Sequence, residues 1–126
     1  MDIREQRYAD VLVLELRGKI NHEGADEFRE RLLGYLDDSA GDYTRVVLDM
    51  SGVDYMSSVG LRALMLAAKK SKEVERPVVA AALNDTMKEI FEISRFNLVF
   101  ELYDSVGDAF AAASEEARSA FAKAGS

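Results

Sequence analysis

The sequence predicts an α/β fold: a single domain over residues 1–126 in which a mixed, mostly parallel β-sheet packs against helices. Short apolar runs alternate with segments of helical periodicity in the order β-β-α-β-α-β-α-β-α, which implies crossover connections between parallel strands. The connection between the first two runs is too short for a crossover, so that pair is expected to be antiparallel. No internal repeat or Pro/Gly-rich linker divides the chain.

The first two strands are expected at Ile3–Tyr8 and Val11–Leu16, joined by a turn at Ala9–Asp10. Gly18 is expected to close the second strand. Asn21 follows and belongs to the residue types that favour the N-cap of a helix. The apolar side of this helix is expected to carry Ala25, Phe28, Leu32 and Leu36.

The middle of the chain predicts a strand, a loop and a long helix. Asp37–Asp42 is a polar cluster that should end the preceding helix. Arg45–Met50 is an apolar run of the kind that is buried on both faces of a sheet. Ser51–Met56 is expected to be a loop, and Ser58–Lys72 a helix. The apolar face of that helix should consist of Leu61, Leu64, Met65 and Ala68.

Two further strands are expected in the second half, at Val78–Leu83 and Leu98–Leu102, each followed by a helix. Either Asn84 or Asp85 should cap the first of these helices. The last helix is expected to be continuous, with one apolar side made of Val106, Phe110, Ala113, Ala117 and Phe121.

The composition argues against several classes of function. A net charge of −7 disfavours attraction to nucleic acid or anionic lipid. The absence of cysteine excludes disulfides and thiolate metal sites, and a single histidine, His22, removes most catalytic triads and multi-histidine metal sites. The N-terminus lacks the apolar core of a signal peptide and no apolar run reaches the length of a membrane span, so we expect a cytoplasmic protein without membrane insertion.

Enzymatic chemistry and cofactors find little support in the sequence. The glycines form neither of the common nucleotide-binding loops. Asp49 and Asp54 flank the expected loop where α/β folds bind ligands and could hold Mg²⁺, but capping and solvation explain most such aspartates. We therefore expect no metal, no cofactor and no catalytic residues. A small-ligand sensor or enzyme with its pocket at the carboxyl ends of the strands is the alternative.

The pair Ser57 and Ser58 stands directly before the long helix. One serine would serve as an N-cap, and two are more than a cap requires. Gly60 is a poor residue for a helix interior and suggests close approach by another surface. Tyr55 and Met56 are apolar residues in an expected loop, where they would be free to meet a partner. A phosphate on Ser58 would lie beside free helix N–H groups, and its charge would break an apolar complex.

Three segments together resemble STAS domains, specifically bacterial anti-sigma factor antagonists. They are VLVLELRGKINHEGADEFRERL, VVLDMSGVDYMSSVGLRALMLAAKKSK and LVFELYDSVGDAF, and they cover nearly the whole chain. The resemblance implies a single STAS domain that binds an anti-sigma factor, itself a serine kinase, and thereby frees a sigma factor for transcription. Phosphorylation of one serine releases the antagonist, and a serine phosphatase resets it. Members commonly act as monomers when free.

The family's phosphorylated serine maps to Ser58 in this sequence. Many antagonists carry aspartate just before it, where this chain has Ser57, so Ser57 is a second candidate acceptor. The resemblance also admits an alternative, a STAS binding subunit of a membrane transport complex of the ABC lipid-transport type, which would not be phosphorylated. The kinase-binding surface implied by the family consists of Lys19, Asn21, His22, Tyr55, Met56, Ser57, Ser58, Gly60 and Leu61.

Overall fold

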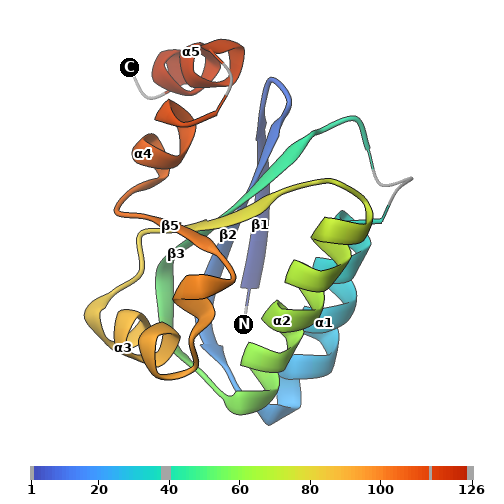
Figure 1. The fold of residues 1–126 in the computed structure, drawn as a ribbon, viewed down its shortest axis with the longest axis vertical. Helices are drawn as coiled ribbons and strands as arrows, with labels where there is room; N and C mark the ends of the chain where they lie inside the picture. Colours follow the sequence, from blue (N-terminus) through green and yellow to red (C-terminus); the bar gives the residue numbers. More distant parts are fainter. Residues whose placement is uncertain (1, 38–40, 114, 125–126) are drawn as a thin grey trace.

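The protein folds around a five-stranded sheet whose strands lie side by side in chain order (Figure 1). The computed structural model describes residues 2–37, 41–113 and 115–124, of which 115–117 and 124 are described without their side chains. The first two strands are antiparallel and all the others are parallel, which confirms the predicted mixed sheet. The strands are β1 (Asp2–Tyr8), β2 (Val11–Ile20), β3 (Arg45–Met56), β4 (Val78–Ala81) and β5 (Glu101–Tyr103).

The helices cover the two faces of this sheet. The larger core lies between the sheet and the first three helices, and the smaller core lies under the fourth and fifth (Figure 1). Leu12 and Leu14 point into the larger core, whereas Val11 and Val13 point into the smaller one, because successive side chains of a strand alternate between its faces. The helices are α1 (His22–Tyr35), α2 (Ser58–Glu73), α3 (Asp85–Ile93), the short 3₁₀ helix η1 (Phe96–Leu98), α4 (Val106–Ala111) and α5 (Glu115–Ala124).

Strands β2 and β3 continue beyond the ends predicted for them. The expected termination at Gly18 is wrong, because the strand runs on to Ile20, and the expected loop Ser51–Met56 is the second half of β3. The two strands pair in parallel over this extension, with register shifts on either side of Gly18. Gly18 has φ of 94°, a left-handed conformation that a residue without Cβ adopts easily. The backbone hydrogen bonds between β2 and β3 therefore outweigh the local preference of Gly18 for a turn.

The C-terminal part also departs from the prediction. Leu98 lies in η1 and not in a strand, and β5 is a three-residue strand. The expected last helix is two helices, because the chain turns after Ala111 and α5 folds back. The turn brings Phe121 onto Phe110, with stacked ring centroids 4.5 Å apart, and sets both against Tyr8. The side chain of Ala117 is outside the described part.

One residue predicted for the buried face of α2 is exposed. Leu64 and Ala68 are buried as expected and Leu61 is partly buried, but Met65 is 40% exposed. The helix packs through small residues, since Ala63 and Ala67 join the buried side and draw α2 close to the sheet and to α1. This packing turns Met65 outwards. Of the helices described, none has both the length and the apolar character needed to cross a membrane.

Candidate partner-binding site at the start of helix α2

The candidate site forms where β2 and β3 end together. Their parallel register pairs Lys19 with Tyr55 and then Ile20 with Met56. Beyond the last pair, the backbone N–H of Ser57 donates a hydrogen bond of 2.8 Å to the carbonyl oxygen of Ile20. The side chains of Lys19 and Tyr55 are exposed, and Tyr55 is 48% accessible. An aromatic ring and a cation thus stand side by side at this edge of the sheet.

Helices α1 and α2 start next to each other directly after these strands (Figure 1). Asn21 caps α1 as predicted, because its side-chain oxygen accepts a 3.2 Å hydrogen bond from the N–H of Gly24. His22 is the first residue of α1 and Ser58 the first of α2, and both are exposed. The fold thus gathers the exposed residues of the predicted surface on one end of the molecule, although they come from two segments of the chain.

The two adjacent serines have different surroundings. Ser57 is the N-cap of α2, and its Oγ accepts a 3.3 Å hydrogen bond from the N–H of Gly60. It is also 6% exposed, so a kinase has little access to its hydroxyl in this conformation. Ser58 is exposed and lines a shallow depression with Val59 and Arg62. Of the pair, Ser58 is therefore the residue whose hydroxyl faces solvent.

The start of α2 suits a negative group. Its first turn carries no acidic side chain. Within the described residues, the backbone N–H groups of Ser58 and Val59 donate no hydrogen bond. Both groups lie at the positive end of the helix dipole and can donate to a bound negative group. Arg62 lies one helical turn after Ser58 and shares the same depression. Arg62 was absent from the predicted site, although its spacing of four residues from Ser58 could have indicated it.

Met56 and Gly60 do not form an exposed surface. The expectation that Met56 lies free in a loop is wrong, because it is the last residue of β3 and 2% exposed. Gly60 is buried, and the close approach that its presence suggested comes from the protein itself. A Cβ atom at Gly60 would lie 2.6 Å from Cγ of Met56 and 2.8 Å from Cγ2 of Ile20. These residues seat the start of α2 on the ends of β2 and β3.

The two aspartates considered for a metal, Asp49 and Asp54, are five residues apart on β3. Asp49 accepts a 3.0 Å hydrogen bond from the N–H of Ser51 within its own strand, and Asp54 is exposed. Within residues 2–37, 41–113 and 115–124, no three side chains of the His, Cys, Asp and Glu types gather as a metal site would require. The candidate site offers an acceptor hydroxyl, an aromatic side chain and positive potential, and these favour recognition by another protein.

Comparisons with known proteins agree with the resemblance seen in the sequence. The STAS domain family model matches residues 2–109. BtrV of Bordetella bronchiseptica, a candidate anti-sigma factor antagonist, is 33% identical over 105 residues, which span 83% of this chain and 88% of BtrV. A solved anti-sigma factor antagonist from Mycobacterium paratuberculosis is 25% identical with a TM-score of 0.74, covering 88% of this chain and 92% of its own.

The Bacillus cell fate determinant SpoIIAA, solved in its phosphorylated form, shares the fold at 14% identity, with a TM-score of 0.65 over 87% of this chain and 97% of its own. The resemblance to anti-sigma factor antagonists is thus confirmed, and the alternative of a transport subunit is not favoured. This chain belongs to the STAS domain family.

Proposed function

We propose that this protein is an anti-sigma factor antagonist that binds an anti-sigma factor serine kinase through the site at the start of α2. Phosphorylation of Ser58 ends this binding, a serine phosphatase restores it, and the cycle regulates transcription that depends on a sigma factor. In this role the protein is a binding partner and a kinase substrate, not an enzyme, and it acts as a cytoplasmic monomer when free. The observation that carries the proposal is the exposed hydroxyl of Ser58 beside the buried, hydrogen-bonded hydroxyl of Ser57.

A phosphate at Ser58 would be tolerated by the fold and opposed by a complex. Phosphoserine adds a charge of about −1.5 to −2 at neutral pH, and the helix dipole with the N–H groups of Ser58 and Val59 favours such a charge. The neighbouring surface includes the exposed ring of Tyr55 and the partly buried side chain of Leu61. Burying a doubly negative group against these apolar residues in an interface costs desolvation energy. The switch therefore acts on binding and leaves the fold intact.

The first test is phosphorylation by the anti-sigma factor kinase encoded in the same genome. The purified chain is incubated with that kinase and ATP, and the phosphate is located by mass spectrometry. We expect one phosphate on Ser58 and none in the Ser58→Ala variant. Ser105→Ala is the matched control, because Ser105 is also an exposed serine at a helix start, capping α4. Phosphate on Ser57 with Ser58 left unmodified would contradict the assignment.

The second test measures binding to the same kinase by calorimetry. We expect Ser58→Asp to weaken binding at least about tenfold, because the carboxylate places a charge in the interface. Ser105→Asp should bind like the unmodified protein, since Ser105 caps α4, and this helix covers the other face of the sheet (Figure 1). Equal binding by Ser58→Asp and the unmodified chain would refute the switch. Such indifference, together with co-purification of an ABC-type ATPase, would instead identify a transport subunit.

A further inference from the structure

A groove runs along the outer side of α2, away from the candidate site at its start. The groove has a volume of about 400 Å³ and lies between α2 and Val99, the residue that follows η1. We call it the α2 groove, and its lining consists of Arg62, Met65, Leu66, Ala68, Lys69, Lys72 and Val99.

The groove is an exposed apolar surface. Met65 is 40% accessible, and Leu66 and Val99 are 36% each. Val99 also borders a second hollow along the outer edge of β5, next to Leu98, which is 77% exposed, and to Leu102. Of the seven large apolar side chains exposed in the described part of the chain, five lie on this continuous surface. Exposed apolar residues scattered singly are ordinary, whereas a contiguous group marks a surface for interaction.

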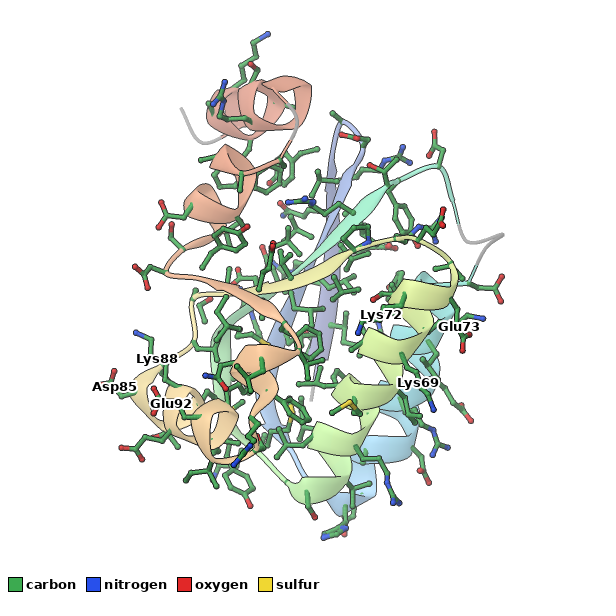
Figure 2. The ribbon with its side chains drawn as sticks, in the orientation of Figure 1. Lys69, Lys72, Glu73, Asp85, Lys88 and Glu92 are labelled. Carbon is green, nitrogen blue, oxygen red and sulfur yellow. The ribbon has the colours of Figure 1, made fainter. Side chains whose placement is uncertain are left out.

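The charge along the groove is opposite to that of the protein. Arg62, Lys69 and Lys72 line it, while the chain as a whole carries a net charge of −7. Figure 2 shows Lys69 and Lys72 along α2, with Glu73 at the end of the same helix. None of the three cations forms an ion pair within 4.0 Å with an acidic residue of the described part, Glu73 included. Their charges are therefore available to an acidic partner.

These features match a helix that binds in a groove. The cations and the apolar residues Met65 and Leu66 follow the spacing i, i+3, i+4, i+7 and i+10 from Arg62, so they form one stripe along α2. The stripe from Arg62 to Lys72 extends ~15 Å at ~1.5 Å per residue, which about ten residues of a partner helix would cover. We infer that the α2 groove binds an acidic amphipathic helix of a partner protein, with its apolar side on Met65, Leu66 and Val99. This inference does not rest on phosphorylation of Ser58.

Two other occupants fit the groove less well. An anionic membrane would be repelled by a protein of net charge −7, and its flat surface does not fill a hollow. A second copy of this chain would have to offer an acidic helix with a free apolar side. Helices α1 and α3 both carry several acidic residues, but the apolar residues Phe28 and Leu32 of α1 and Met87 and Phe91 of α3 are buried in the core. Ile93 is a single exposed apolar residue at the end of α3 and forms no apolar side. A helix from another protein is the occupant that satisfies both the charge and the shape.

The test is a titration of the ¹⁵N-labelled full chain with synthetic peptides of 18 residues (roughly five helical turns), followed by NMR. The probe peptide places leucine at helical spacing on one side and glutamate on the others. We expect saturable shifts at the amides of residues 62–72 and of Val99. The double variant Lys69→Glu/Lys72→Glu should weaken binding at least about tenfold. Lys88→Glu should bind unchanged, since Lys88 is an exposed lysine on α3 outside the groove (Figure 2).

Three results would overturn the inference. One is the absence of shifts at these amides at millimolar peptide. A second is an equal response to a scrambled peptide or to one with lysine in place of glutamate. A third is that the protein binds phosphatidylserine vesicles, or associates with itself, through the same lysines. In that case the double variant would abolish this binding and the acidic peptide would not compete with it. Because the substituted lysines are exposed on α2, the variants should stay folded, which circular dichroism verifies. Lys72 lies in the last turn of α2, so the glutamate there opposes the helix dipole and should lower the thermal midpoint slightly.

Discussion

The backbone N–H of Ser57 donates a 2.8 Å hydrogen bond to the carbonyl oxygen of Ile20, and this bond joins the end of β2 to the start of α2. The two residues are far apart in the sequence, and the parallel register of β2 and β3 brings them together. The candidate site is consequently built on the sheet itself. Its geometry depends on buried residues such as Ser57 and Gly60, which no partner can touch.

The two serines should differ in their contribution to stability. Ser57→Ala removes the N-cap of α2 and should lower the free energy of unfolding by about 1 kcal/mol. Ser58→Ala should change it by less than about 0.5 kcal/mol, because the hydroxyl of Ser58 is exposed. Urea denaturation followed by circular dichroism measures both. A larger loss from Ser58→Ala than from Ser57→Ala would mean that the capping roles are exchanged.

A negative charge at Ser58 should stabilise the free protein even though it opposes binding. Because the first turn of α2 has no acidic residue, Ser58→Asp should raise the free energy of unfolding by about 0.3–1 kcal/mol at low salt through the helix dipole. The gain should shrink in 1 M NaCl, and Ser58→Lys should be destabilising under the same conditions. Chemical denaturation at both salt concentrations provides the comparison. Destabilisation by Ser58→Asp would count against the proposed tolerance for phosphate.

Gly60 and Gly34 should respond oppositely to alanine. Gly60→Ala gains about 1 kcal/mol of helix propensity, but the new Cβ crowds Met56 and Ile20, and such overpacking costs about 1–3 kcal/mol. The net result should be a loss of stability. A Cβ at Gly34 meets nothing within 4 Å, so Gly34→Ala in α1 should stabilise the protein by about 0.5–1 kcal/mol. Thermal melts of the two variants should shift in opposite directions, and a gain from Gly60→Ala would contradict the close packing.

Arg76 should be needed for stability although it lies far from the candidate site. Its guanidinium donates hydrogen bonds to the carbonyl oxygens of Asp37 at 2.9 Å and Gly41 at 3.0 Å and lies over the ring of Tyr43. Arg76→Met keeps the apolar stem and removes these hydrogen bonds and the cation over Tyr43, so it should cost about 2–3 kcal/mol. Arg29→Met is the control, because Arg29 sits on the surface of α1, and it should change stability by about 0.5 kcal/mol at most. Similar losses in both variants, measured by urea denaturation, would refute this role.

Tyr43 should make the protein sensitive to alkaline pH. Burial raises the pKa of Tyr43 above its ordinary value of 10.0. The unfolded chain therefore loses this proton first as the pH rises, so the stabilisation is complete below pH 10 and is lost above it. Tyr43→Phe also removes the hydrogen bond from the Tyr43 hydroxyl to the carbonyl oxygen of Tyr35.

At neutral pH the Tyr43→Phe variant should therefore be about 1 kcal/mol less stable than the unmodified chain. The difference between the two should shrink as the pH rises above 10. Denaturation curves collected from neutral to alkaline pH measure it. A difference that grows with pH would contradict the shifted pKa.

Local signals predicted the parts of the fold that local physics controls. Asn21 and Asn84 cap their helices as expected, because an N-cap needs only a short polar side chain before a helical segment. The alternation of strands and helices was also predicted correctly as far as the last helix, which is two helices in the structure. The same local signals failed for Met56, which was expected in a loop and is buried in β3, since turn-like residues around it are held by the neighbouring strand.

The candidate site was likewise predicted in part from the sequence and decided in part by the tertiary structure. A family resemblance in the sequence predicted Ser58 as the acceptor and Ser57 as a second candidate, but it could not show that the side chain of Ser57 is buried. That burial comes from the direction in which each side chain points once α2 is seated on β2 and β3. Arg62 and the α2 groove were missed because the apolar stripe of an isolated helix does not indicate which side the core will cover.

The sequence by itself determined the order of the elements, the helix caps and the position of the serine pair, because each follows from contacts between residues close in the chain. The tertiary structure alone decided that β2 and β3 extend to their helices, that Ser57 is buried while Ser58 is exposed, and that Met65 faces outwards. These outcomes depend on parallel pairing and on the close approach of Gly60 to Ile20, contacts between segments that are distant in sequence. Only the packed sheet and its helices bring such segments within reach.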